Sequence, residues 1–386
     1  CQCVVRKPFI MAKNNRTEWP EEGEGYLEIS EKGFGFLRSP GNRFQSKPSD
    51  VFVTPDTIRS KYLREGCFIK GRLVPPHKGH SPQLTEIYSV NEMPFKEYTE
   101  CSRFENLTSI DPLDKFNLET TPEELETRII DLVTPIGKGT RGLIVASPRT
   151  GKTTILKQIC NAVTTNHPDV KTIVLLIDER PEEVTDFERS VEAEVVASSN
   201  DMDLETHVRL SRFMVERCRR MVECGQDVFM LMDSITRIAR AYNNVKGGSG
   251  RTMSGGVDAR ALEIPRRMFA AARNIENGGS LTILATALVD TGSRMDELIF
   301  QEFKGTGNME LILDRKLAER RLYPAIDIPK SGTRKEEKLF PEEHLDAIHK
   351  LRRTMVDLDP VNAMETLIGA LKKHPTNAEL LSKLKT

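Results

Sequence analysis

Short apolar runs alternate with longer amphipathic stretches through the middle of the chain. The apolar runs predict buried strands at Gly142–Ala146, Thr172–Ile177, Val228–Met232 and Ser280–Leu288. The amphipathic stretches predict helices at Lys152–Thr165, Thr206–Glu223 and Ala259–Asn274. Strands that alternate with helices in this way favour an α/β fold with a mostly parallel sheet covered by helices.

The pattern before residue 93 is different. Short runs with the composition of strands recur between turns rich in Gly, Pro and Asn, at Gly25–Ile29, Gly33–Leu37, Asp50–Val53, Gly66–Leu73 and Leu84–Val90. This spacing predicts a small all-β barrel.

The same patterns divide the chain into four expected parts. These are an N-terminal tail or truncated remnant at residues 1–22, the barrel at 23–92, a linker at 93–120, and the α/β domain with C-terminal helices at 121–386. Thr121 followed by Pro122 and two acidic residues predicts a helix start. Polar helices are expected at the end, at Pro341–Val356 and Asn362–Lys373.

Composition narrows the class of protein. The formal net charge of -1 neither demands nor excludes a nucleic-acid partner, so any such site must be a local patch. No apolar stretch approaches the roughly 18 residues of a membrane span. The seven cysteines are scattered without a CxxC pair, which argues against a disulfide framework and a zinc site and favours a cytoplasmic protein. Because the chain begins with Cys1, we expect a fragment that lacks its true N-terminus, unless Met11 is the start.

A phosphate-binding loop is the most specific motif. The predicted strand Gly142–Ala146 runs into Ser147-Pro148-Arg149-Thr150-Gly151-Lys152-Thr153 and then into a predicted helix. This matches GxxxxGK[ST], except that Ala146 replaces the first glycine. Backbone N–H groups of such a loop bind phosphate oxygens, Lys152 reaches the β- and γ-phosphates of ATP, and Thr153 binds Mg²⁺. The alternative is a glycine turn that caps an ordinary helix.

Two acidic residues end later strands. Asp233 follows Phe229–Met232, and Glu179 follows Leu175–Ile177. Ligands bind at the carboxyl ends of parallel strands, so both acids are expected beside Lys152. Asp233 is the candidate Mg²⁺-associated acid, and Glu179 is the candidate group that orients the attacking water. The alternative is that each acid caps the following helix.

Arg334 lies in Ser331-Gly332-Thr333-Arg334, after an apolar stretch. An arginine on such a loop can contact a γ-phosphate across a subunit boundary. The alternative is a solvated arginine beside Lys335 and Glu336.

Aromatic residues in the barrel region indicate a nucleic-acid surface. Phe34 and Phe36 lie on one face of a strand, and Arg38 and Phe52 can join them. Exposed aromatic rings stack unpaired bases. The alternative is that the rings fill the barrel core. Two loops of the α/β domain also offer basic side chains, Arg251 within 246–256 and Arg294 within 291–296, and the alternative for both is an ordinary surface loop.

Together these motifs resemble the bacterial transcription termination factor Rho family over residues 23–386. The resemblance implies an OB/cold-shock-like RNA-binding barrel followed by a RecA-like P-loop ATPase domain. It implies a homohexameric ring that acts as an RNA-dependent ATPase and 5′-to-3′ RNA/DNA helicase. It also implies that the ring loads on C-rich nascent RNA and dislodges RNA polymerase from an elongation complex with its elongation factors.

The resemblance also assigns residues to roles. Glu179, Lys152 and Arg334 match catalytic positions, with Arg334 as an arginine finger from the next subunit. Thr153 and Asp233 match the Mg²⁺ positions, and Tyr323 matches an aromatic that stacks on adenine. The remaining nucleotide positions are Pro148, Arg149, Thr150, Gly151, Thr154 and Arg180, and Arg180 and Arg321 match residues that couple neighbouring subunits. The RNA positions are Phe34, Phe36, Arg38, Phe52, Arg251, Thr252, Ser254, Gly255 and Arg294.

This sequence departs from the family at a few positions. Ser147, Arg149 and Thr150 change the lining of the nucleotide loop, and Pro82-Gln83-Leu84 replaces a charged and aromatic run on the barrel. On this resemblance we expect the family's N-terminal helical subdomain to be absent or truncated in the given sequence. Two other functions fit parts of the pattern: a rotary ATP synthase subunit, and an RNA-binding module with a nucleotide switch but no motor.

Overall fold

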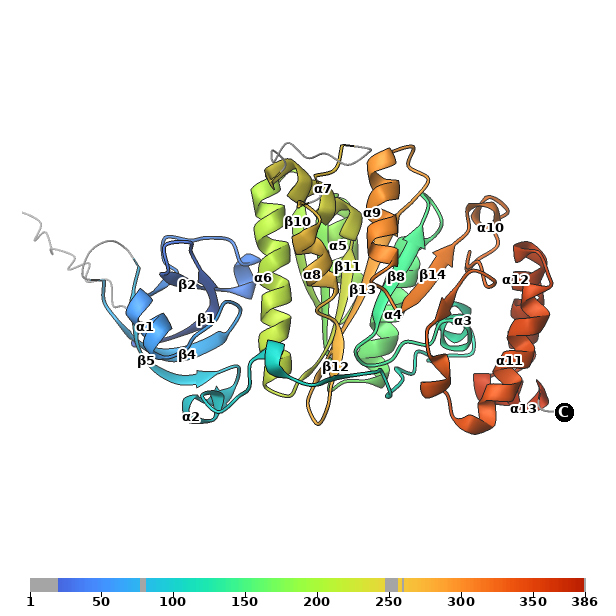
Figure 1. Ribbon diagram of the computed structural model, residues 1–386, viewed down its shortest axis with the longest axis horizontal. Coiled ribbons are helices and arrows are strands. Elements are labelled where there is room, and N and C mark those ends of the chain that lie inside the picture. The colour runs from blue at the N-terminus through green and yellow to red at the C-terminus, as the bar shows by residue number, and fades with distance from the viewer. Residues whose placement is uncertain (1–19, 77–80, 247–255, 259, 385–386) are drawn as a thin grey trace, which may run out of the picture.

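The structure is a computed structural model that describes residues 20–76, 81–246, 256–258 and 260–384. A small barrel, blue in Figure 1, lies against helix α6 (Leu204–Glu223) of a larger α/β domain. The C-terminal helices lie at the far side of that domain from the barrel.

The barrel is built from six strands in the order β3-β2-β1-β4-β5-β6. They are β1 (Glu22–Ile29), β2 (Gly35–Arg38), β3 (Val51–Val53), β4 (Phe68–Val74), β5 (Gln83–Val90) and β6 (Met93–Pro94). A parallel pair between Phe52 and Gln83 joins β3 to β5 and closes the sheet. Alternate residues such as Leu27, Leu37 and Val53 point inward and form the barrel core. The predicted barrel is confirmed.

The barrel extends beyond its predicted end. Strand β6 pairs with β5, and the short helix α2 (Phe95–Tyr98) places Tyr98 in the barrel core. The linker predicted at 93–120 therefore begins later. The rest of it contains only short elements, which are η2 (Phe104–Asn106) and β7 (Ser109–Ile110).

The α/β domain contains a nine-stranded sheet whose main order is β10-β9-β11-β13-β8-β14-β15. The parallel strands are β8 (Arg141–Ala146), β9 (Lys171–Glu179), β10 (Glu194–Ser199), β11 (Asp227–Asp233), β13 (Ser280–Leu288) and β14 (Met309–Leu313). Their central residues are mostly apolar and buried because helices cover both faces of the sheet. Three short antiparallel strands border it, β7, β12 (Arg273–Ile275) and β15 (Gly332–Thr333).

The helices divide between two cores, one on each face of the sheet. One core takes buried residues from α3 (Leu125–Val133), α4 (Lys152–Asn166), α5 (Pro181–Ser190), α10 (Arg315–Glu319), α11 (Glu342–Val356), α12 (Pro360–Leu371) and α13 (Asn377–Leu384). The other takes them from α6, α7 (Ile235–Lys246), α8 (Glu263–Phe269) and α9 (Arg294–Lys304). Shorter elements complete the fold, namely α1 (Pro55–Ser60), η1 (Pro40–Asn42) and η3 (Glu336–Lys338).

Two predicted helix boundaries are wrong. The helix expected from Thr121 begins at Leu125, because residues 122–124 form a turn in which the Thr120 hydroxyl donates to Glu124. The helix expected over Ala259–Asn274 is shorter, Glu263–Phe269, and Arg273 already begins β12. A local hydrogen bond at the first place, and strand pairing of β12 at the second, override the sequence pattern.

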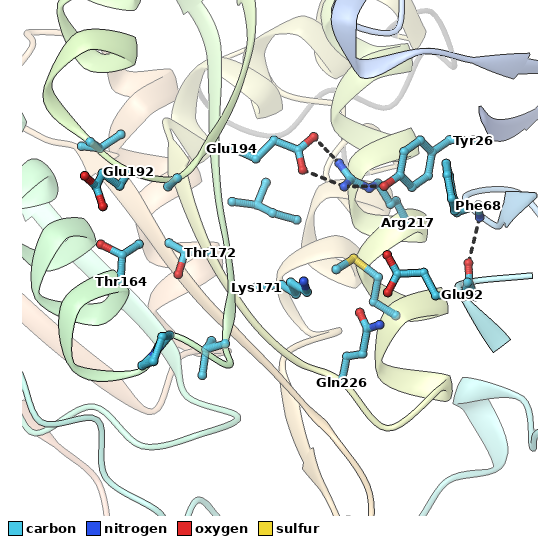
Figure 2. A pocket seen from close by; sticks show the side chains of 17 residues that line it. Tyr26, Phe68, Glu92, Thr164, Lys171, Thr172, Glu192, Glu194, Arg217 and Gln226 are labelled. Carbon is cyan, nitrogen blue, oxygen red and sulfur yellow. Dashed lines mark hydrogen bonds and ion pairs between the residues drawn. The ribbon is translucent and has the colours of Figure 1, made fainter. Parts of the chain in front are cut away.

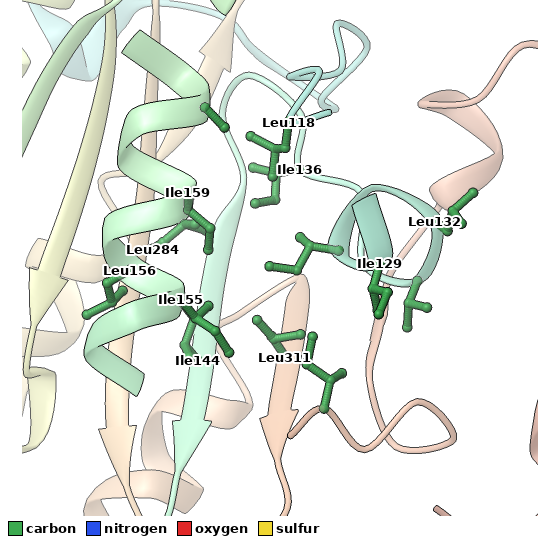
Figure 3. Packing of buried hydrophobic residues seen from close by; sticks show 14 of the residues in the cluster. Leu118, Ile129, Leu132, Ile136, Ile144, Ile155, Leu156, Ile159, Leu284 and Leu311 are labelled. Carbon is green, nitrogen blue, oxygen red and sulfur yellow. The ribbon is translucent and has the colours of Figure 1, made fainter. Parts of the chain in front are cut away.

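The packing of α4 fixes the loop that precedes it. Figure 3 shows Ile155 and Ile159 of α4 directed toward Ile144 of β8 and its neighbours in the same core. Because both the strand and the helix are anchored by buried side chains, the loop between them has fixed ends. The nucleotide loop predicted from the sequence therefore lies at the carboxyl edge of the sheet.

Candidate nucleotide and RNA sites

The phosphate loop connects β8 to the N-terminus of α4. Gly151 caps α4 with a φ of 84°, a left-handed conformation that strains any residue with a Cβ atom. A Cβ atom at this position would also lie 3.4 Å from the ring of Tyr323. The Thr150 hydroxyl donates to the carbonyl of Ser147 at 2.8 Å, which closes the loop on itself. The loop thus presents backbone N–H groups at a helix N-terminus, as anion binding requires.

Lys152 and Asp233 lie together, as the sequence predicts. The Lys152 Nζ donates to both carboxylate oxygens of Asp233 at 2.7 Å. Asp233 ends β11 and accepts a further hydrogen bond from the Thr286 hydroxyl of β13 at 2.7 Å. Since β13 pairs with both β11 and β8, the acid is held beside the end of the phosphate loop, where α4 begins.

Glu179 is the last residue of β9 and is only 3% exposed. Burial raises the pKa of its carboxyl; the Arg237 guanidinium opposes that rise, and the nearby charge of Asp233 adds to it. The Arg237 nitrogen lies 3.0 Å from Oε2, in an ion pair without hydrogen-bond geometry. Oε2 accepts no hydrogen bond from the residues that the structure describes, so a water molecule can serve as its partner.

The oxygen donors at this site fit Mg²⁺. Thr153, at the start of α4, and Asp233 supply a hydroxyl and a carboxylate, and Mg²⁺ prefers such oxygen ligands. Among the described residues no group of three His, Cys, Asp or Glu side chains could hold a metal. Mg²⁺ commonly takes one or two protein ligands and completes its shell with phosphates and water.

An aromatic side chain borders the loop. Tyr323 is 41% exposed, and with Pro148, Arg149 and Arg321 it lines a cavity of about 520 Å³. Its ring therefore presents an open face beside the phosphate loop, where a planar base can stack. Arg180 is exposed at the N-terminus of α5, directly after Glu179.

Arg334 lies far from the phosphate loop of its own chain. It follows Thr333, which pairs with Met309 at the start of β14. The loop follows Ala146, which pairs with Leu313 at the other end of β14. Four residues of strand separate the two ends, about 13 Å at roughly 3.3 Å per residue. Arg334 is exposed and lies next to Arg141, whose pKa is lowered by burial and by the charge of Arg334.

Three phenylalanines form an open cluster on the barrel. The ring centroids of Phe34, Phe36 and Phe52 lie 5.7–5.8 Å apart, and each ring is half-buried. None of the three belongs to the barrel core. The alternative in which these rings fill the core is therefore wrong, and the cluster is a surface on which a base can stack.

Arg38 is more enclosed than the sequence suggests. It is 8% exposed, its Nε donates to Glu28 at 2.5 Å, and its Nη1 pairs with Asp50. The guanidinium lies 5.1 Å from the centre of the Phe36 ring. Arg38 therefore lies beside the phenylalanine cluster, as the sequence predicts, but it is held there between two carboxylates. Glu28 and Asp50 were not predicted; the alternation of β1, which puts Glu28 opposite Phe36, is the signal that identifies Glu28.

The predicted RNA loops are described only in part. Arg251, Thr252, Ser254 and Gly255 lie outside the described residues. Arg294 is exposed at the first position of α9. No helix among the described residues is long and apolar enough to cross a membrane.

Comparison with known proteins connects these sites. Residues 126–333 match the ATP synthase alpha/beta family, nucleotide-binding domain, and residues 23–96 match the Rho termination factor, RNA-binding domain. Transcription termination factor Rho of Cereibacter sphaeroides is 49% identical over 383 residues, covering 98% of this chain and 91% of the relative. That of Escherichia coli is 48% identical over 369 residues, covering 94% and 88%. The chain belongs to the transcription termination factor Rho family.

Membership of the Rho family confirms the resemblance seen in the motifs. The chain is an ATP-hydrolysing enzyme that carries an RNA-binding domain. A solved structure of a prototypical ATPase from the type III secretion system of pathogenic bacteria has a TM-score of 0.59 and 22% identity, covering 72% of this chain and 86% of that one. At that identity it shows the RecA-like fold alone. The match of residues 23–96 to the Rho RNA-binding domain excludes the rotary ATP synthase alternative.

Proposed function

We propose that this Rho family member is an RNA-dependent ATPase and 5′-to-3′ RNA/DNA helicase that terminates transcription in the cytoplasm. It binds C-rich, nascent single-stranded RNA, assembles as a homohexamer, and dislodges RNA polymerase from elongation complexes that carry elongation factors. The observation that carries the proposal is one chain that joins an open aromatic surface to a phosphate loop with Lys152, Asp233 and Glu179 in place.

The residues of the nucleotide site divide the work of hydrolysis. Lys152 exchanges its contact with Asp233 for the β- and γ-phosphates of ATP. Mg²⁺, held by Thr153 and Asp233, offsets phosphate charge when it is bound. Glu179 accepts a hydrogen bond from the attacking water through Oε2, which accepts none from the described residues, and then takes up the proton of that water. Tyr323 stacks on adenine above the loop.

The site is completed by the next subunit. Arg334 lies at the opposite end of β14 from its own loop, which favours a contact with a neighbour's γ-phosphate. There its guanidinium stabilises charge in the transition state. Arg180 and Arg321, both exposed near the site, carry the state of one site to the adjoining subunit.

RNA is bound in two places. On the barrel, bases stack on Phe34, Phe36 and Phe52, and the Arg38–Asp50 pair places a donor beside an acceptor. That pair matches the edge of cytosine, whose amino group donates and whose ring nitrogen and carbonyl accept. In the ring, the loops with Arg251–Gly255 and Arg294 hold the phosphate backbone during translocation.

RNA-stimulated hydrolysis tests this function directly. We expect poly(C) to raise the ATPase rate of the wild-type chain at least about tenfold, and ATP to drive release of the DNA strand from an RNA/DNA hybrid. The measurements are phosphate release with and without RNA, and gel analysis of the hybrid. An ATPase rate that does not change on addition of RNA would contradict the proposal. Stimulation of hydrolysis without release of the DNA strand would instead favour an RNA-binding module with a nucleotide switch but no motor.

Phe36→Ala tests the barrel surface. Loss of one stacking ring is worth about 1–3 kcal/mol per base, so the Kd for oligo(C) is expected to rise roughly five- to a hundredfold. The variant should fold normally because Phe36 lies outside the barrel core. Fluorescence anisotropy with labelled oligo(C) measures the Kd. Tyr62→Ala is the matched control, since Tyr62 is a 71% exposed aromatic residue outside the Phe cluster. An unchanged Kd in Phe36→Ala would remove these rings from the RNA site.

A further inference from the structure

One face of the barrel sheet carries both the base-binding side chains and the contact with the α/β domain. Tyr26 and Glu28 are two residues apart on β1 and lie on the same face. Glu28 is opposite Phe36, and Tyr26 is opposite Arg38. Figure 1 shows this barrel beside α6. A base stacked on Phe36 of β2 therefore lies next to β1, the strand whose Tyr26 and Glu28 contact α6.

Glu28 joins the two sides of this face. The residue is 9% exposed, and its carboxylate binds two arginines from different domains. Oε2 accepts from Arg38 Nε at 2.5 Å, and Oε1 accepts from the Arg209 guanidinium of α6 at 2.7 Å. Arg209 also donates to the carbonyl of Phe44 at 3.1 Å, so its position against the barrel is fixed by two acceptors.

A second arginine of α6 anchors the same strand. Arg217 lies two helical turns after Arg209 on the same side of α6, and its guanidinium is 4.1 Å from the centre of the Tyr26 ring. Figure 2 shows Arg217 between the Tyr26 hydroxyl and both carboxylate oxygens of Glu194, at 2.9, 2.5 and 2.7 Å. Glu194 begins β10, which pairs with β9. Through α6, strand β1 is therefore held against the sheet that carries Glu179.

We propose that Glu28 is a positioning residue that sets Arg38 for base recognition and, through Arg209, links RNA binding in the barrel to docking of the barrel on α6. The inference rests on the proposed function, in which bases bind beside Arg38. One carboxylate shared by two arginines gives the link its physical basis. A base that accepts hydrogen bonds from Arg38 draws that guanidinium away from Glu28, and the carboxylate charge is then left to Arg209.

RNA binding and the contact between Glu28 and Arg209 must affect each other equally, by thermodynamic linkage. If bound RNA strengthens the contact between Glu28 and Arg209, that contact must strengthen RNA binding by the same factor. The Arg209 side chain of α6 is 29% exposed, so it can be replaced without opening the core. Without Arg209, Glu28 pairs with Arg38 alone. Glu28 then competes more strongly with the incoming base for the Arg38 guanidinium.

Arg209→Gln tests the inference in the full chain. We expect the Kd for labelled oligo(C) to rise about tenfold and the preference for oligo(C) over oligo(U) to fall, because Glu28 without Arg209 holds Arg38 more strongly against the incoming base. Arg212→Gln is the matched control. Arg212 lies three residues later on α6 and pairs with Glu65 of the barrel at 3.1 Å, in a different contact from that of Glu28. This control should leave both the Kd and the base preference within about twofold of wild type.

The double variant separates positioning from general loosening of the domains. Glu28→Gln and Arg209→Gln should be non-additive in the Kd, because each removes the same contact. Additive effects, or equal effects of Arg209→Gln and Arg212→Gln, would overturn the inference. So would an Arg209→Gln protein that matches wild type in both Kd and base preference while Phe36→Ala binds RNA poorly. A wild-type chain that fails to bind oligo(C) would instead overturn the proposed function itself.

Discussion

Glu179→Gln is expected to lower RNA-stimulated turnover by about a hundredfold to ten-thousandfold, the usual contribution of a general base. The glutamine has nearly the same shape but cannot accept the proton of the attacking water. ATP affinity should stay within about threefold of wild type, because Glu179 is not among the groups expected to hold the phosphates. Phosphate release at saturating poly(C) gives kcat, and equilibrium binding of a fluorescent ATP analogue gives the Kd.

Glu183→Gln is the control for this experiment. Glu183 lies in the first turn of α5, where its charge acts on Glu179 from the exposed side. Its replacement removes one nearby acid without touching the reacting water, so kcat should change less than about threefold. A Glu179→Gln protein with wild-type turnover, or one that has lost ATP binding as well, would contradict the assigned role.

The pH dependence of kcat provides a second readout for Glu179. Burial raises the pKa of its carboxyl, so the group takes up a proton at a higher pH than an exposed glutamate does. A protonated carboxyl cannot act as the base. RNA-stimulated kcat should therefore decline as the pH falls, beginning above the ordinary glutamate range, while ATP binding persists at the same pH.

The nucleotide site could be predicted because its side chains lie at the carboxyl ends of parallel strands, which meet at one edge of the sheet. Lys152 and Asp233 are 81 residues apart in sequence, yet both lie at carboxyl ends of parallel strands, where side chains converge. The apolar runs locate those strands within a few residues. The ends of helices depend on contacts that the apolar pattern does not reveal, as at Leu125 and Glu263.

The contact between the domains could not be predicted in the same way. Arg209 and Glu28 are 181 residues apart, and they meet because one face of the barrel docks on one face of α6. Neither residue stands in a recognisable motif. The enclosure of Arg38 depends likewise on strand register, since Glu28 and Asp50 reach it from β1 and from the loop before β3. Such contacts follow from the packing of finished elements rather than from local patterns.

Arg334→Ala is expected to reduce hydrolysis about a thousandfold or more, because an arginine finger contributes about 10³–10⁵ to kcat. Loss of activity alone does not show which subunit uses the residue. Lys335→Ala serves as the control for charge on this loop: Lys335 is exposed and pairs with Asp111, and its loss should leave turnover near wild type. Phosphate release at saturating RNA and ATP measures both variants.

Mixing two inactive proteins identifies the subunit that Arg334 serves. Arg334→Ala subunits keep an intact Lys152, and Lys152→Ala subunits keep an intact Arg334. In a head-to-tail ring assembled from equal amounts, about one interface in four combines a working phosphate loop with a working arginine from its neighbour. Activity should then reappear in the mixture. If Arg334 served its own chain, no interface would be complete and the mixture would stay inactive. The strand register, which holds Arg334 at the opposite end of β14 from its own loop, favours the first result.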